Sequence, residues 1–297
     1  MQFGQVPNPE DIDFTLPADH TGTLEMFQGH LKKDKMKVFI GCAKWNRQEL
    51  KGFYPRGTKD ELAYYSTQFN SIELNATFYN IYGREQTKKW AAKTPPGFRF
   101  FPKVPRLVSH IKRLSGAGVI VEEYCDGLRG FGDKLGVVFL QMPDNFQPKD
   151  MGRLEDFVEA FPKDIPLAVE LRNTQWFADE EVAGELYRIF EANNTVNIIT
   201  DTAGRRDLLH MRLTSPNAFV RYVGANHSSD YNRLDDWLER IRQWADLGLQ
   251  NLNFFVHQNL ERESPHLSAY LIEKLNKDLN FDLTVPRAMP DQGTLNL

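Results

Sequence analysis

The chain has 297 residues, of which 41% are hydrophobic and 26% are charged, and these values are ordinary for a globular protein. The formal net charge of −4 argues against a broad electrostatic hold on nucleic acid or anionic membrane, although a local basic patch stays open. Its 2 cysteines, Cys42 and Cys125, are far apart, which excludes a disulfide scaffold, a cysteine-type zinc site and an iron–sulfur cluster.

The first residues carry neither the basic region nor the apolar core of a signal peptide, and no apolar run is long enough to span a membrane. We therefore expect a cytoplasmic protein with no membrane partner. Residues 1–35 are polar and carry three prolines, so we interpret them as an N-terminal extension packed on the body, with a helix near Thr23–His30. Residues 36–285 are expected to form the main domain and residues 286–297 a tail.

Short apolar runs typical of strands covered on both faces begin after the extension. Eight are predicted: Val38–Gly41, Ser71–Thr77, Arg99–Val104, Gly136–Met142, Leu167–Leu171, Val196–Asp201, Phe219–Gly224 and Leu252–Gln258. Amphipathic helical patterns lie between them, and the clearest has one apolar face at helical spacing, made by Leu234, Trp237, Leu238, Ile241 and Trp244. The last helix begins at Ser264–Pro265, an N-cap residue followed by proline.

The alternation of strands and helices predicts the fold. Strands begin roughly every 31 residues, the usual length of a βα unit, and the total length suits a single (β/α)8 TIM barrel. The sixth unit is the weakest, because only residues 202–217 join its strand to the next one. An open doubly wound sheet is the competing fold, but the sequence after the first strand, GCAKWN, lacks the G-x-G-x-x-G pattern.

Polar side chains interrupt the apolar strands near their C-terminal ends, where a barrel carries its chemistry. The predicted second strand places Glu73, Asn75 and Thr77 on one face, because side chains alternate along a strand. The other strands add the following residues: Lys103, Gln141, Glu170, Arg172, Asp201, Arg221 and His257. Buried charges need partners or a ligand, so two interpretations are open, namely a self-satisfied ion-pair network or a ligand site. We favour the ligand site because polar networks this rich at barrel mouths usually serve a ligand.

Several segments resemble one known family. They are IGCAKWN, FNSIELNATFY at 69–79, GFRFFPKVPR at 97–106, LQMP at 140–143, AVELRNTQW at 168–176 and FFVHQN at 254–259. Together they resemble the YecE-like family of TIM barrels (domain of unknown function 72) over roughly residues 37–280. The resemblance implies the barrel fold but no activity, because the family is functionally undefined.

The sequence departs from this family at one position. Many members carry histidine in an R-x-H-G pattern on the seventh strand, whereas this chain has Val223 between Tyr222 and Gly224. A chemistry that used that histidine would have to proceed without it here, or use His227 instead.

The favoured hypothesis is an enzyme, a hydrolase or an isomerase, acting on a small anionic or sugar-like ligand, with a phosphate or a carboxylate as the anionic group. The assigned anion clamp is Lys103, Arg172 and Arg221, because guanidinium groups pair with such oxygens. The acid–base set is Glu73, Glu170 and Asp201, provided that their environments separate their pKa values. The ligand would be oriented by Asn75, Gln141 and His257. No cofactor is expected.

Three alternatives remain open. A divalent metal would use Glu170, Asp201 and His257, a mixed carboxylate and imidazole set. A nucleic-acid or phosphodiester-binding protein, similar to endonuclease-IV-like barrels, would use basic residues at 103–113 and 205–206, with aromatic faces from Phe53, Tyr54, Phe78, Tyr79 and Trp176. A non-catalytic ligand sensor is the third. The sequence leaves the oligomeric state open.

Overall fold

A computed structural model describes residues 5–29 and 35–287. The described residues form nine strands: β1 Lys37–Cys42, β2 Ser71–Leu74, β3 Arg99–Pro102, β4 Val138–Gln141, β5 Leu167–Glu170, β6 Val196–Asn197, β7 Ile199–Thr202, β8 Asn217–Val223 and β9 Asn251–His257. Most of the predicted C-terminal tail, residues 288–297, lies outside the described residues, as do residues 1–4 and 30–34.

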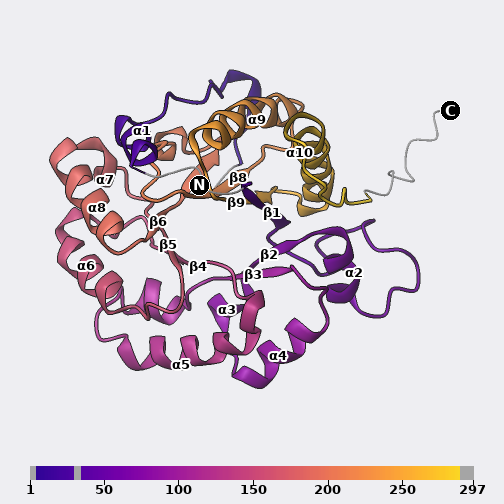
Figure 1. Ribbon diagram of the computed structural model, residues 1–297, viewed down its shortest axis with the longest axis horizontal. Helices are drawn as coiled ribbons and strands as arrows, with labels where there is room; N and C mark the ends of the chain where they lie inside the picture. Colours follow the sequence, from indigo (N-terminus) through magenta and orange to yellow (C-terminus); the bar gives the residue numbers. More distant parts are fainter. Residues whose placement is uncertain (1–4, 30–34, 288–297) are drawn as a thin grey trace.

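Helices surround the strands, which lie in the middle of the molecule (Figure 1). They are α1 Thr21–Gln28, α2 Glu61–Gln68, α3 Ala76–Tyr79, α4 Arg84–Ala92, α5 Gly118–Leu128, α6 Met151–Ala160, α7 Gln175–Ala178, α8 Glu180–Ala192, α9 Ser229–Leu247 and α10 Ser264–Leu279. In the described part of the chain, no helix is both long enough and apolar enough to cross a lipid bilayer.

All hydrogen-bonded strand pairs are parallel, and they form three separate sheets. The strand orders are β1-β9-β8-β7, β2-β3 and β4-β5-β6. The predicted α/β class with parallel strands is therefore observed. A closed (β/α)8 barrel is not confirmed, because the ladders of the three sheets are not joined into one.

The gaps between the sheets are bridged in other ways. Between β1 and β2, the Asn70 side chain accepts a hydrogen bond from the Ile40 amide at 2.9 Å and donates one to the Val38 carbonyl at 2.7 Å. Between β3 and β4, the amide of Gly136 donates to the carbonyl of Phe100 at 2.8 Å. These contacts satisfy edge groups that a continuous ladder would otherwise pair.

Two layers of side chains face the space enclosed by the strands. The lower layer is apolar and aromatic, and its rings pack closely, with the centroids of Phe101 and Phe255 4.8 Å apart. Two residues further along the strands, on the same face, the layer becomes polar. This polar layer contains Lys103, Gln141, Glu170, Thr200, Arg221 and His257. The polar layer therefore lies at the carboxyl ends of the strands, on an aromatic floor.

Two predicted strands are shorter than expected. The segment Ser71–Thr77 leaves the sheet at Leu74, and Ala76 begins the short helix α3, so the expectation that Asn75 and Thr77 extend the strand face is wrong. Thr77 instead donates from its hydroxyl to the carbonyls of Leu74 and Lys103, which closes the turn. The segment Val196–Asp201 is divided into β6 and β7 at Ile198.

The sixth βα unit, which is the weakest in the sequence, also departs from the regular pattern in the structure. Among the described residues, no α-helix joins β7 to β8, and helix α1 of the N-terminal extension packs there instead. The Thr23 hydroxyl donates to the carbonyl of Met211 at 2.9 Å, and the His20 ring lies 5.4 Å from the Tyr187 ring of α8. The extension thus covers the region between α8 and α9 that a crossover helix would otherwise cover (Figure 1).

Candidate functional site

Arg221 of β8 is the centre of the polar layer. Its Nε and Nη2 atoms donate to the two carboxylate oxygens of Glu73 on β2, at 2.9 and 3.0 Å. Its Nη1 atom donates to Oε2 of Glu170 on β5 at 2.6 Å. One buried guanidinium therefore links carboxylates from two different sheets, and the fork on Glu73 is the strong bidentate form of this contact.

Glu170 has further partners. The Arg172 Nε atom donates to its Oε1 at 2.7 Å, and the Gln141 amide donates to its Oε2 at 2.8 Å. Arg172 reaches it from the loop after β5, and its side chain remains 23% exposed. We call Glu73, Lys103, Gln141, Glu170, Arg221 and His257 the inner network.

Burial alone would raise the pKa values of the two inner carboxyls. For Glu73, the charges of Arg221 and His257 overcome burial and hold the pKa well below its usual range. For Glu170, Arg172 and Arg221 lower the pKa in the same way. The predicted separation of the pKa values is thus not what the geometry produces, because both groups are held in their ionised form.

Lys103 is the unusual cation of the inner network. It is 8% exposed, and its Nζ atom donates to the neutral side-chain oxygen of Gln141 at 2.9 Å. In the described part of the chain, no carboxylate oxygen lies within 4.0 Å of that nitrogen, whereas Arg221 has two carboxylate partners. Burial, followed by the charge of Arg221, lowers the pKa of Lys103 to about 7.

His257 and Asn75 complete the contacts of Glu73. The His257 Nε2 atom lies 2.9 Å from Glu73 Oε2, and the Asn75 amide donates to Glu73 Oε1 at 2.9 Å. On its other side, His257 faces Glu261, with Nδ1 and Oε1 4.0 Å apart, and burial raises the pKa of the Glu261 carboxyl. Glu261 was not among the residues predicted from the sequence, because it follows the strand in an acidic segment that resembles a solvated loop.

Two hydroxyls on β7 complete the inward face of the polar layer. Thr200 and Thr202 are paired in register with Arg221 and Val223, so they share the inward face with Arg221. Both hydroxyls are buried and have no hydrogen-bond partner among the described residues. Buried hydroxyls are rarely left unpaired, so these two are available for a guest molecule or water.

Asp201 lies elsewhere, so its assignment to the acid–base set is wrong. As the residue between two inward-facing threonines, it points to the opposite side of the strand, toward α9. Its carboxylate accepts from Arg233 Nη2 at 2.8 Å and from Trp237 Nε1 at 2.7 Å, and it also pairs with Arg206. We call Asp201, Arg206, Asp230 and Arg233 the outer cluster.

The metal alternative fails on the same geometry. Its three proposed ligands are divided between the inner network and the outer cluster, and both oxygens of Glu170 are occupied by donors. Within residues 5–29 and 35–287, no group of three or more histidine, cysteine, aspartate or glutamate side chains is arranged to hold a metal ion. His227, suggested from the sequence as a replacement for the family's histidine on the seventh strand, does not join the inner network. Its ring contacts Ser229 at the start of α9.

The sequence did not single out His110. It lies on the π-helical turn Leu107–Ile111 that follows β3, and its ring meets the edge of Phe78 at 5.1 Å. Phe78 in turn lies 4.4 Å from the Lys103 ammonium. Burial and the charges of Lys103 and Arg172 lower the pKa of His110 to about 4, so the imidazole is neutral at pH 7. π-Helical turns are frequent at functional sites.

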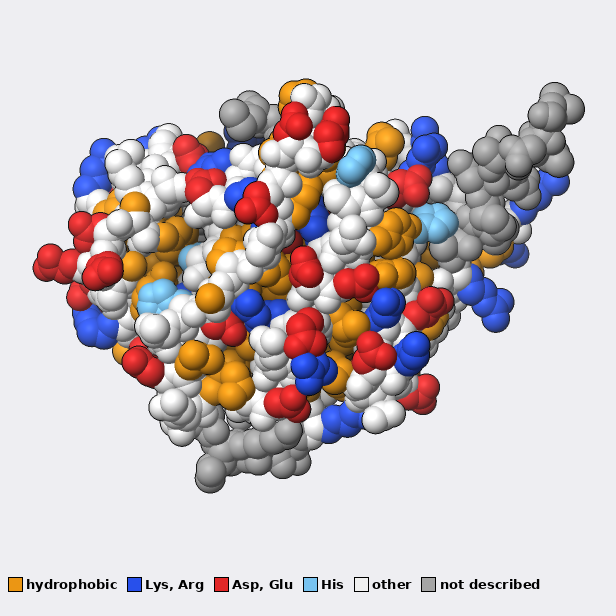
Figure 2. All heavy atoms as spheres, turned by 90° about the horizontal axis from the view of Figure 1, so that it is seen from above, with side chains coloured by type: hydrophobic (Ala, Val, Ile, Leu, Met, Phe, Trp, Pro, Cys, Tyr) orange, Lys and Arg blue, Asp and Glu red, His pale blue; other side chains and the backbone are white. Residues whose placement is uncertain are grey.

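Several residues proposed for nucleic-acid binding are buried or paired, whereas Arg106, Lys112 and Arg113 are exposed. Phe53, Tyr54 and Trp176 are buried and offer no stacking face, whereas Tyr79 is 73% exposed. Arg205 pairs with Asp207 and Asp144, and Arg206 belongs to the outer cluster. On the face shown in Figure 2, basic and acidic side chains are interspersed. A continuous basic footprint is therefore missing from that face.

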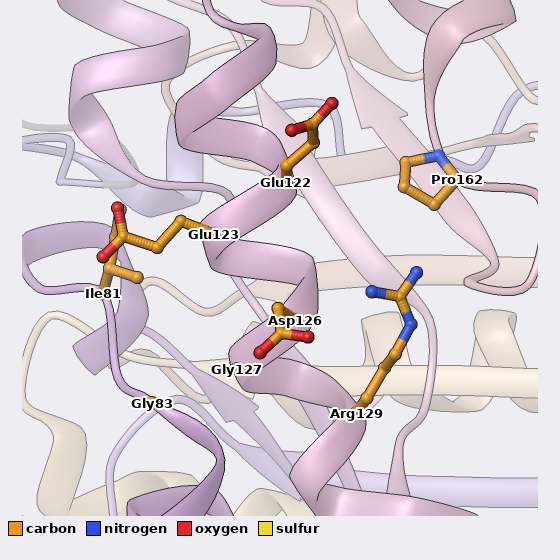
Figure 3. A pocket seen from close by; sticks show the side chains of 8 residues that line it. All are labelled: Ile81, Gly83, Glu122, Glu123, Asp126, Gly127, Arg129 and Pro162. Carbon is orange, nitrogen blue, oxygen red and sulfur yellow. The ribbon is translucent and has the colours of Figure 1, made fainter.

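A surface cavity of about 520 Å³ lies apart from the inner network, beside α5 (Figure 3). Glu122, Glu123 and Asp126 line it, and Asp126 is held by Arg84 through a hydrogen bond of 3.0 Å. Three carboxylates make this cavity unsuited to the anionic ligand predicted from the sequence.

Comparison with known proteins identifies the family. A family profile described as "Protein of unknown function DUF72" matches residues 39–291. The chain belongs to the DUF72 family. This confirms the YecE-like resemblance found in the sequence motifs.

Two UPF0759 proteins are similar to this chain. The UPF0759 protein YecE of Escherichia coli K12 is 27% identical over 277 residues, which cover 87% of this chain and 99% of that protein. The UPF0759 protein YunF of Bacillus subtilis 168 is 29% identical over 150 residues, or 48% of this chain and 52% of that protein.

Solved structures of DUF72 proteins share the fold. A member from Thermotoga maritima superposes with a TM-score of 0.67 at 22% identity, covering 82% of this chain and 100% of that one. A member from Enterococcus faecalis gives a TM-score of 0.68 at 17% identity, covering 84% and 98%.

Proposed function

We propose that this DUF72 protein is an enzyme that binds a small anionic ligand, carrying a phosphate or a carboxylate, at the carboxyl ends of its strands. The observation that carries the proposal is Lys103, a buried cation whose described hydrogen-bond partner is a neutral amide. Burying a charge without a counter-ion costs free energy, and an anionic guest would supply that counter-ion.

The anion clamp differs from the one that the sequence suggests. Arg221 already pairs with Glu73 and Glu170, so its charge is committed. Arg172 also pairs with Glu170, but its side chain is partly exposed and reaches the site from a loop. In the proposal, Lys103 and Arg172 hold the anion, and the Thr200 hydroxyl adds a hydrogen bond to a neutral oxygen.

The roles of the carboxylates also change. Since Glu73 and Glu170 are held ionised by arginines, neither has a proton to give near pH 7. In the proposal they fix Arg221, Gln141 and Arg172 in position rather than act as acid and base. The group placed to move a proton near neutral pH is Lys103, whose pKa is about 7.

The contacts within the site also suggest how the three sheets are related. We propose that the three sheets are segments of one (β/α)8 barrel, in which β6 and β7 together form the sixth strand. The bridging contacts of Asn70 and Gly136 and the convergence of Glu73, Glu170 and Arg221 from separate sheets support this.

Titration with inorganic phosphate tests the function. A bound anion favours the protonated form of Lys103, so binding at pH 7.5 should take up protons, which calorimetry in buffers of different ionisation enthalpy measures. Arg172→Gln should weaken phosphate affinity about tenfold, the effect of losing one charged hydrogen bond. Arg188→Gln, on the outer surface of α8, is the matched control. Absence of phosphate binding, or equal affinities for the two variants, contradicts the proposal.

A further inference from the structure

We propose that Lys103 forms an imine with the carbonyl group of its ligand, so that the substrate class is a small aldehyde or ketone that also carries an anionic group. This inference rests on the proposed function, because the anionic group is what holds the carbonyl beside the lysine. It adds the reacting atom and the chemical class of the substrate.

The surroundings of the Lys103 nitrogen are those of a nucleophilic amine. The rings of Phe78 and Phe139 lie 4.4 and 5.7 Å from it, and they exclude water from two sides. Gln141 accepts one hydrogen bond at 2.9 Å, which fixes the direction of the side chain without adding a negative charge. A carboxylate in that position would hold the group as an ammonium ion.

Arg221 supplies a neighbouring positive charge, which is the second feature of a nucleophilic lysine. Lysine amines become nucleophilic near neutral pH when they are desolvated or lie next to another cation, and Lys103 meets both conditions. The contrast within the chain is clear: Lys44, which follows β1, lies 3.3 Å from the carboxylate of Glu49 and is partly exposed. Both lysines lie near the carboxyl ends of strands, but Lys103 alone of these two is buried without a carboxylate partner.

The reaction balances without an oxidant or a further reactant. The nitrogen lone pair of the neutral amine attacks the carbonyl carbon, and the carbonyl π electrons move to oxygen, which takes a proton from nitrogen. The carbinolamine then loses its oxygen as water, whose two hydrogens derive from the amine, and a carbon–nitrogen double bond remains. Protonation of the imine by solvent restores a positive charge at Nζ, which the anionic group of the ligand stabilises as it would an ammonium ion.

The experiment is reductive trapping. The full chain is incubated at pH 7 with dihydroxyacetone phosphate, and separately with pyruvate, in the presence of cyanoborohydride, which delivers hydride to the imine carbon. We expect one stable adduct per chain with at least one of these probes, located at Lys103 by peptide mapping. Inorganic phosphate should protect against labelling, since it occupies the anion site.

Variants provide the controls. Lys103→Arg should abolish the adduct, whereas Lys44→Arg should keep it, with folding of each checked by circular dichroism. If Lys103→Arg does not fold, peptide mapping of the adduct on the chain without substitutions still decides the test. Phosphate binding without any adduct overturns the imine and leaves the proposed function standing, whereas failure of phosphate to bind contradicts the proposed function itself. Adducts scattered over exposed lysines also overturn the inference.

Discussion

The inner network and the outer cluster are two groups of buried charges that lie on opposite faces of the same strand. Thr200 and Asp201 are consecutive on β7, yet Thr200 shares the inward face with Arg221 and Asp201 faces α9. In the outer cluster, aspartates and arginines balance, and the ring of Phe14 from the N-terminal extension covers Arg233 at 4.5 Å.

The inner network also has two carboxylates and two cations, but its ion pairs leave Lys103 out. It contains a lysine whose described partner is a neutral amide, and two threonine hydroxyls beside it lack partners in the described chain. The difference teaches that burial and charge alone do not mark a site. A buried polar group that still needs a partner is the more useful mark, although the outer cluster also holds one, the Nε atom of Arg233.

The largest expected effect tests the structural role of the outer cluster. Asp201→Ala removes a carboxylate from Arg233 and Trp237 and leaves Asp230 as the remaining carboxylate partner of the buried Arg233. Loss of one partner from a buried ion-pair network should lower the free energy of unfolding by about 3–5 kcal/mol. Urea unfolding measures this. Asp246→Ala, an exposed residue of α9 that lies 3.9 Å from Arg242, should change little. Loss of phosphate affinity in a folded Asp201→Ala protein would instead place Asp201 in the site.

A smaller effect is expected in the inner network. Glu170→Gln keeps the shape but removes a charge from Arg221 and Arg172, and we expect a loss of about 2–3 kcal/mol in unfolding free energy. Phosphate affinity should rise, because the site then carries one negative charge less. If affinity falls in calorimetry, Glu170 contacts the ligand directly.

Lys103 gives a pH signature that its Met variant should lack. Its pKa is about 7 in the folded chain and returns to its ordinary, higher value on unfolding, so the unfolded state binds more protons between those values. Stability should therefore rise from pH 7 to about pH 8.5, below the ordinary range of lysine titration. Lys103→Met should flatten this rise in melting temperature. Parallel pH profiles for both proteins would show that Lys103 carries an ordinary charge.

The smallest effect concerns Thr200. Replacing its unpartnered hydroxyl by the methyl group of valine should stabilise the protein by about 1 kcal/mol, because a buried hydroxyl without a partner is costly. Thermal unfolding measures the change. Destabilisation by Thr200→Val would mean that the hydroxyl has a partner, such as an ordered water, in solution.

Local patterns in the sequence determined much of this protein. Continuous Val, Phe and Leu runs predicted the parallel strands, and the spacing of Leu234, Trp237, Ile241 and Trp244 predicted α9, because each signal depends only on neighbouring residues. The DUF72 motifs predicted the family for the same reason. Glu73, Lys103, Glu170 and Arg221 were also found from sequence, as charges that interrupt apolar strands.

Only the tertiary structure decided which of these charges meet. Asn75 turned out to precede the short helix α3, and Asp201 to face away from the site, because the end of β2 and the break at Ile198 depend on contacts with distant segments. The state of Lys103 depends on Phe78, Gln141 and Arg221, which come from three other elements. Burial and charge pairing are properties of the packed chain, so no local pattern encodes them.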